Sequence, residues 1–308
     1  MNPLRGILLK LLSVVVFTAM AAIVKSTAEE IPAGERVFFR SFFAIPVIVL
    51  WLAMRHDFPR GLRTTYPIGH FWRSLVGVTA MGCGFMALGL LPFPEAVAIG
   101  YAAPLLTVVF AAMFLGERLR IYRLGAVFLG LLGVLVILSP RLSVLEPGMR
   151  VTDAQTLGAV VALLGAVFAA LAAVFVRRLV QTERTPAIVF YFSAFAALLS
   201  LVSLPWGWVM PSPRTAGLLI LAGLAGGLGQ ICLTEAYRHA ETSVVAPFEY
   251  SSMLLAIAVG YLVFGEGPAA ETLAGAGLVV AAGLFIIWRE HRLGLKRDAA
   301  RRVVTPQG

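Results

Sequence analysis

Charged side chains are scarce in this chain. Lys, Arg, Asp and Glu together make up 13% of the 308 residues, whereas hydrophobic residues make up 59% and the mean hydropathy is +0.89. A soluble core cannot hide that much apolar surface, so the soluble classes of protein are excluded. The chain is therefore predicted to be a polytopic membrane protein.

Cysteines and catalytic motifs are also sparse. The two cysteines, Cys83 and Cys232, both fall in hydrophobic runs, where a thiol serves as a small packing group rather than in a disulfide framework or a metal site. The sequence has no Walker motif, no spacing typical of zinc ligands and no nucleophile elbow. These absences argue against an ATP-driven pump and against an enzyme, and we expect no cofactor and no metal.

Long hydrophobic runs dominate what is present. A helix needs about 20 apolar residues to cross roughly 30 Å of hydrocarbon. Ten runs meet or approach that length, near residues 4 to 24, 33 to 54, 69 to 91, 95 to 115, 121 to 138, 156 to 176, 186 to 204, 214 to 235, 243 to 263 and 270 to 288. The predicted fold class is an all-α membrane protein with ten transmembrane helices.

Residues 74 to 138 and 223 to 287 repeat one another at a constant offset. The matched positions include Leu75 with Leu224, Gly77 with Gly226, Cys83 with Cys232, Ala87 with Ala236, and Tyr101 with Tyr250. Because each copy holds an odd number of spans, five, the second copy is inverted relative to the first. The predicted units are a first repeat over 1 to 138, an external linker over 139 to 155, a second repeat over 156 to 290, and a basic tail over 291 to 308 whose composition favours disorder.

Basic residues gather at alternate ends of the predicted spans. With the N-terminus in the cytoplasm, most of the 25 Lys and Arg fall in cytoplasmic loops and in the tail. We therefore predict an inner-membrane protein with both termini in the cytoplasm. The net charge of +9 follows from this topology and from contact with anionic headgroups, so a nucleic-acid partner is not expected.

Ionisable residues inside spans are the candidate functional residues, since each is costly in hydrocarbon unless it faces a cavity or a partner. Arg40 lies well inside the second span, where substrate contact, an internal ion pair and structural anchoring all stay open. Glu249 lies inside the ninth span and is too short to snorkel to the surface. It is the leading candidate for substrate or proton binding, with pairing to an arginine such as Arg73 as the alternative.

Arg73 and Glu235 lie close to the cytoplasmic ends of their spans, where an interfacial position is the simpler interpretation. Their candidate roles are substrate binding or gating for Arg73 and gating or proton coupling for Glu235. Lys10 is interpreted as a structural residue that snorkels to the cytoplasmic surface.

Two tyrosines occupy matched repeat positions on helices that also contain a proline. An approximate twofold axis between the repeats would place Tyr101 and Tyr250 opposite one another, where they either stack on a planar substrate or simply pack. Pro104 lies in the middle of its span and predicts a kink, whereas Pro247 also suits an ordinary helix start. The matched Gly116-Glu117 and Gly265-Glu266 are explained by helix termination alone.

The sequence resembles the EamA group of the drug/metabolite transporter superfamily over roughly residues 5 to 290. Two features carry the resemblance: proline-bearing spans that end in Phe114-Leu115-Gly116-Glu117 and in Val263-Phe264-Gly265-Glu266, each followed by a glycine-rich span. The resemblance implies two inverted five-helix repeats around a central cavity, no bound cofactor, and transport of small organic solutes.

Within that superfamily, three segments are similar to the S-adenosylmethionine uptake carriers: Glu35 to Arg40, His70 to Arg73, and Ala246 to Tyr250. One position departs from their pattern. Glu249 stands where a basic residue recurs between the two aromatic residues, and this reversal of charge argues against S-adenosylmethionine itself as the substrate.

The predicted function is secondary transport of a small organic metabolite, of amino-acid, vitamin or nucleotide-derivative type, by alternating access. Arg40, Arg73, Tyr101, Glu249 and Tyr250 are the predicted substrate-binding residues. A proton-coupled exporter of drugs or toxic metabolites is the alternative, and a channel or a membrane-embedded enzyme is less favoured. The expected partners are the solute and the bilayer, while coupling to protons and a homodimer stay open.

Overall fold

The computed structural model describes residues 3–115, 121–142, 154–179, 182–239 and 246–303, and all regular structure in those residues is helical. The first half contains α1 (Pro3–Ser26), α2 (Ala33–Phe42), α3 (Ala44–Met54), η1 (Arg60–Leu62), α4 (Pro67–Leu90), α5 (Phe93–Gly100), α6 (Ala102–Leu115) and α7 (Ile121–Leu142). The second half contains α8 (Ala154–Leu179), α9 (Thr185–Ser200), η3 (Leu201–Ser203), α10 (Pro213–His239), η4 (Ala246–Tyr250), α12 (Ser251–Phe264) and α13 (Ala270–Val303).

Nine helical stretches in the described part of the chain are long and apolar enough to cross a membrane. They coincide with nine of the predicted spans. The remaining prediction, 243 to 263, corresponds to a shorter apolar stretch, Phe248–Phe264. The first three residues of that prediction and the linker residues 143 to 153 lie outside the described residues. The chain is therefore an all-helical, multi-pass membrane protein.

Proline residues interrupt two of the spans near their middles. Pro104 lacks the N–H that would bond the Gly100 carbonyl, and the helix stops at Gly100 and restarts at Ala102 as α6. Pro46 has the same relation to Phe42, where α2 ends and α3 begins after Phe43. The kink expected from Pro104 is present. In both places the proline cannot bond a backbone carbonyl at membrane depth, and that carbonyl needs another polar partner.

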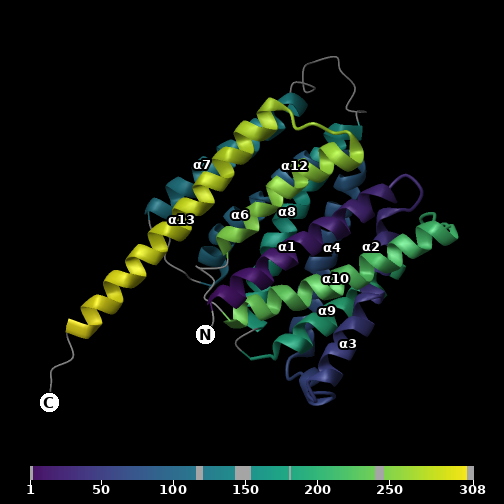
Figure 1. Ribbon diagram of the computed structural model, residues 1–308, viewed down its shortest axis with the longest axis horizontal. Helices are drawn as coiled ribbons and strands as arrows, with labels where there is room; N and C mark the ends of the chain where they lie inside the picture. Colours follow the sequence, from purple (N-terminus) through teal and green to yellow (C-terminus); the bar gives the residue numbers. More distant parts are fainter. Residues whose placement is uncertain (1–2, 116–120, 143–153, 180–181, 240–245, 304–308) are drawn as a thin grey trace.

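Three helix pairs make the most extensive contacts in the bundle: α1 with α10, α4 with α8, and α7 with α13. Figure 1 shows α7 and α13 side by side along one edge, away from α1 and α10. The glycines of α10 permit close approach to the α2–α3 kink. A β-carbon at Gly223, for example, would lie 2.5 Å from the β-carbon of Phe43.

The last helix is longer than the sequence predicts. The tail from 291 was expected to be disordered, yet α13 continues to Val303. Alanine, leucine, lysine and arginine dominate this segment, and all of them favour helix. The helix extends away from the bundle in Figure 1.

Candidate functional site

Glu249 forms an ion pair with Lys10, from the opposite end of the sequence. The Lys10 ammonium donates to the Glu249 carboxylate. Only 1% of the Lys10 side chain is exposed, against 47% for Glu249, so this lysine does not snorkel to the surface as the sequence suggested. The predicted alternative, a pair between Glu249 and Arg73, is wrong: Glu249 pairs with Lys10, and Arg73 lies over the ring of Phe192. The pair joins α1 in the first half of the chain to η4 in the second half.

Tyr250 directly follows Glu249 in the sequence, and Tyr101 lies against Tyr250 in space. Their ring centroids are 5.4 Å apart in an edge-to-face arrangement, which confirms the predicted juxtaposition. Tyr101 is buried, and its hydroxyl is within hydrogen-bond distance of the Ser252 hydroxyl. Tyr250 packs on Gly283 of α13, where a β-carbon would overlap its ring. Both tyrosines are packed in this conformation, and substrate stacking stays a prediction.

Arg40 and Arg73 gather around one aromatic ring. The guanidinium carbon of Arg73 lies 3.6 Å from the centroid of Phe192, and that of Arg40 lies 5.9 Å from it. These residues come from α2, α4 and α9, all of them membrane-spanning. Arg40 is 6% exposed. Sequence reasoning selected both arginines, but it gave no sign that they share Phe192.

The end of the bundle where α1 finishes, the predicted external end, is held by a polar clasp. Lys25 lies 2.9 Å from Glu266 and donates to the carbonyl oxygens of Leu88 and Leu91 at 3.3 and 2.7 Å. The other carboxylate oxygen of Glu266 accepts from the backbone N–H of Phe93 at 2.7 Å. This external clasp connects the ends of α1, α4 and α12 with the start of α5.

Gly265 ends α12 in the left-handed conformation, with φ of 66°, as the sequence predicts. Helix termination does not explain all of this dipeptide, however, because Glu266 is the acceptor in the clasp. Its repeat mate Glu117 lies outside the described residues. A hollow of about 460 Å³ opens beside the clasp, lined in part by Lys25, Glu29 and Glu266.

The predicted cytoplasmic end, where α1 starts and α3 finishes, carries different ion pairs. Glu235 of α10 accepts from Arg55, after the end of α3, at 2.8 Å, and His239 lies 3.8 Å away. Glu235 is 7% exposed, so it is a buried partner and not a free interfacial group. Arg184 and Asp57 form a more exposed pair at 3.2 Å. These contacts join α10 and α9 to the segment after α3.

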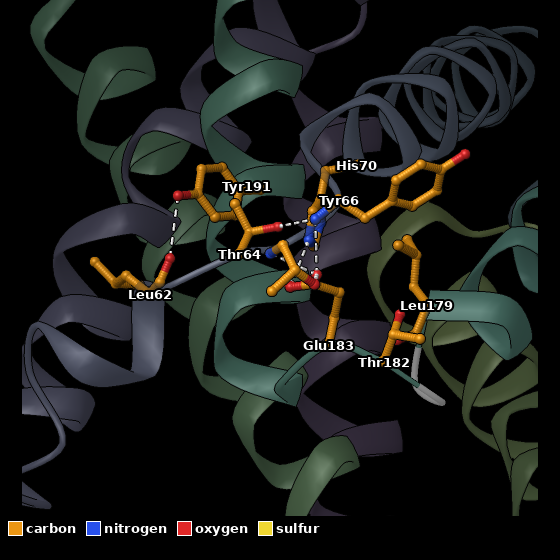
Figure 2. A network of polar contacts seen from close by, with 9 residues as sticks. Leu62, Thr64, Tyr66, His70, Leu179, Thr182, Glu183 and Tyr191 are labelled. Atoms are coloured by element: carbon orange, nitrogen blue, oxygen red, sulfur yellow. Dashed lines mark hydrogen bonds and ion pairs between the residues drawn. The ribbon is translucent and has the colours of Figure 1, made fainter.

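The network around Glu183, between α8 and α9, has no counterpart in the sequence predictions (Figure 2). One carboxylate oxygen accepts from the backbone N–H and the hydroxyl of Thr65, at 2.8 and 2.7 Å, and from the backbone N–H of Tyr66 at 3.0 Å. The other lies 3.3 Å from Nε2 of His70. Burial by itself would raise the pKa of Glu183, but hydrogen bonds from Thr65, with contributions from Thr64 and His70, lower that pKa to about 2.

Glu183 is expected to make the stability of the protein depend on acid pH. Its folded pKa is lowered, so the stabilisation is present above the unfolded value, about 4.3, and disappears as pH falls toward 2. Glu183→Gln should lower the free energy of unfolding by roughly 1–3 kcal/mol at pH 7 and flatten the pH dependence below 5. Thermal unfolding of the purified protein between pH 3 and 7 measures both effects.

Asp57→Asn is the matched control for that experiment. Asp57 lies at the same end of the bundle, but its pair with Arg184 is exposed and worth less than about 1 kcal/mol. An acid profile that changes equally in the two variants would contradict the assignment to Glu183.

Sequence reasoning missed Lys25, His70 and Glu183 for one common reason. Each lies at or near a span boundary, where a charged residue is ordinary, and nothing local indicates which distant backbone group it reaches. His70 within a predicted span was the one available signal. In the described residues, no group of three or more His, Cys, Asp or Glu suits a metal ion.

The geometry defines a class of protein: a helical, multi-pass membrane protein whose two halves are joined by ion pairs that are at least partly buried. The model of the EamA-like transporter family matches residues 4–139 and 156–288, and the chain belongs to this family. The family belongs to the drug/metabolite transporter superfamily, and its members and the relatives of this chain are named as transporters and not as enzymes.

The chain is 34% identical over 279 residues to the pseudopaline exporter CntI of Pseudomonas aeruginosa, covering 90% of this chain and 94% of that protein. It is 27% identical to an S-adenosylmethionine uptake transporter of Rickettsia felis, with 94% of each chain covered. It is 29% identical to a riboflavin transporter of Rhizobium johnstonii, covering 82% and 89%. A crystal structure with 21% identity superposes with a TM-score of 0.63, over 94% of this chain and 98% of that one, a likeness in fold alone.

Proposed function

We propose that this protein moves a small organic metabolite across the inner membrane as a secondary transporter with alternating access. One observation carries the proposal: α1 forms an ion pair near each of its two ends. The pair near its start is with η4, and the pair near its end is with a residue just after α12. Lys10 binds Glu249, and Lys25 binds Glu266. At 1.5 Å per residue the two lysines are about 22 Å apart along the helix. One end can therefore open while the pair at the other end stays closed.

The packing of the helices supports an inverted repeat, with units at 1 to 138 and 156 to 290 joined by the linker 139 to 155. Exchanging the repeats turns the contact of α1 with α10 into that of α8 with α4, and these are two of the three dominant contacts. The third, α7 with α13, joins the last spans of the two halves and is exchanged with itself. Two such halves provide two gates around one central site.

The orientation proposed here has both termini in the cytoplasm, on the basis of the distribution of Lys and Arg. Under it, Lys25–Glu266 is the external gate and Lys10–Glu249 belongs to the cytoplasmic gate. Glu235 would support the cytoplasmic gate by holding α10 to the end of α3 through Arg55. Tyr101 and Tyr250 would contact the solute when the packing around them opens.

Export is the direction favoured by one observation. The relative with 34% identity over 90% of this chain is an exporter. Proton-coupled export is the second candidate, with Glu249, whose side chain is half-exposed beside Lys10, as the proposed coupling residue. The solute is expected to be of amino-acid, vitamin or nucleotide-derivative type, as the names of the relatives suggest.

Exchange in proteoliposomes tests the carrier mechanism. Labelled pseudopaline, S-adenosylmethionine and riboflavin are offered to liposomes that are loaded or not loaded with the same unlabelled compound. A carrier should take up at least one of them several-fold faster into loaded liposomes. The unlabelled solute inside binds to the carrier, and the occupied carrier then returns to the outside to collect another labelled molecule. An imposed pH gradient then separates proton coupling from simple exchange.

Protein-free liposomes and the variant Glu271→Gln serve as controls, since Glu271 lies in the exposed first turn of α13. Unitary conductance without acceleration by internal solute would overturn the carrier in favour of a channel.

A further inference from the structure

The central charge balance of the bundle is uneven. Each of the carboxylates described above has a partner: Glu249 has Lys10, Glu235 has Arg55, Glu266 has Lys25, and Glu183 has Thr65 with His70. Arg40 and Arg73, by contrast, have no carboxylate within ion-pair distance in the described part of the chain. Arg40 and Arg73 are therefore two positive charges on membrane-spanning helices that no carboxylate in that part of the chain neutralises.

The burial of these two cations makes that imbalance costly. Arg40 is 6% exposed, and Nε and Nη1 of Arg73 are buried without a hydrogen-bond partner among the residues that the structure describes. Two like charges beside one ring repel each other, and unbonded N–H groups lose their interactions with water. Phe192 offsets part of this through its ring face, but a cation–π contact supplies only about 0.5–2 kcal/mol. An anion that accepts from both guanidinium groups would remove the remaining cost.

Two glycines at matched repeat positions leave room for the guanidinium group of Arg40 and for the ring of Phe192. A β-carbon at Gly226 of α10 would lie 3.0 Å from Nε of Arg40, and one at Gly77 of α4 would lie 3.5 Å from Nη1 of Arg73. Gly77 and Gly226 occupy matched positions of the two copies. Gly226 of the second half therefore admits Arg40 of the first, and Gly77 of the first half admits Phe192 of the second, whose ring would lie 2.9 Å from the added β-carbon. These contacts place the two cations between the halves.

We propose that Arg40 and Arg73 form the recognition site for a carboxylate group of the transported solute, with Phe192 holding both guanidinium planes. The inference rests on the proposed transport function and narrows the solute to organic acids and amino acids that carry a free carboxylate. Arginine suits this role because its planar fork bonds both oxygens of a carboxylate. The site lies on α2, α4 and α9 and shares no residue with the Lys10–Glu249 and Lys25–Glu266 pairs, so the gates can move while the carboxylate is held.

Thermal unfolding of the purified wild-type protein tests the site directly. The carboxylate probes are succinate, glutarate and citrate, and the matched uncharged probes are the diamides succinamide and glutaramide. We expect at least one carboxylate to raise the Tm by about 5 °C near saturation and the amides to have no effect. Absence of any shift with all three carboxylates would overturn the proposal, as would an equal shift with the amides.

Variants assign the shift to these arginines. Arg40→Gln and Arg73→Gln should abolish it, whereas Arg63→Gln, at an exposed position after η1, should leave it unchanged. If either glutamine variant fails to fold, Arg73→Lys keeps the charge without the fork and should weaken binding at least tenfold. Retention of the full shift in the folded variants would remove Arg40 and Arg73 from the site.

Phosphate separates two sources of anion. A shift in Tm with inorganic phosphate that matches or exceeds the shift with the carboxylates would assign the arginine pair to phosphate groups, free or on lipid, and overturn a carboxylate site.

Exchange assays on the same variants keep this proposal distinct from the transport function. If Arg40→Gln and Arg73→Gln exchange solute at the wild-type rate, the carrier stands and the anion site falls. If no solute is exchanged but carboxylates still stabilise the protein, the site stands and the carrier falls.

Discussion

Glu249→Gln should destabilise the protein far more than Lys10→Met, although the two residues form one ion pair. Removal of Glu249 breaks the ion pair of an ammonium group that is 1% exposed, and breaking a buried pair costs about 3–5 kcal/mol. Removal of Lys10 leaves a carboxylate that is 47% exposed and can bind water, at a cost of about 1 kcal/mol. In thermal unfolding, the glutamine variant should lose roughly 10 °C in Tm and the methionine variant only a few degrees.

The double variant Lys10→Met with Glu249→Gln completes the cycle. It should recover most of the stability lost in Glu249→Gln, since the buried ammonium group is then absent as well. Glu271→Gln again provides the exposed carboxylate control. Equal losses in the two single variants, or no recovery in the double variant, would contradict the asymmetric burial on which this prediction rests.

Lys25→Met should open the external end of the bundle. The substitution removes the ion pair with Glu266 and the bonds to the Leu88 and Leu91 carbonyls, and leaves those acceptors at a partly buried helix end. A charged hydrogen bond contributes about 1.5–3 kcal/mol, so the population of externally open protein should rise roughly ten- to a hundred-fold.

Labelling of a buried cysteine measures that population. Val24 is fully buried next to Lys25, and Val24→Cys in a background with Cys83→Ser and Cys232→Ser reports on the external end. The maleimide reaction from outside should accelerate by the same factor in Lys25→Met. The matched control is Ile48→Cys, at a buried position of α3, the helix that leads to the predicted cytoplasmic end, and its reaction should not change. Equal acceleration at both cysteines would indicate general loosening and not a gate.

The spans and the kink at Pro104 were predictable because they follow from local sequence. Hydrocarbon requires continuous apolar helices, and Pro104 removes a hydrogen bond wherever its helix lies. The pairing of Tyr101 with Tyr250 was also within reach, since the repeat relates the two positions. The helical extension to Val303 was missed because charge was given more weight than helix propensity.

The partners of the charged residues were out of reach. Glu249 was identified as unable to stand alone, but its partner Lys10 is 239 residues away in sequence and Arg73 was an equally reasonable candidate. The same holds for Glu183 and His70, which join the loop before α9 to α4 (Figure 2). Periodicity indicates that a residue is buried, but it does not indicate which helix faces it.

The sequence by itself determined that this protein is a helical membrane protein of duplicated design with ionisable residues at membrane depth, because burial in lipid restricts each segment separately. The tertiary structure alone decided which charges are paired, that α1 is bound to the other half near both of its ends, and that two arginines share Phe192 without a carboxylate partner in the described part of the chain. Those facts depend on the relative placement of helices, which long-range packing sets and no local pattern encodes.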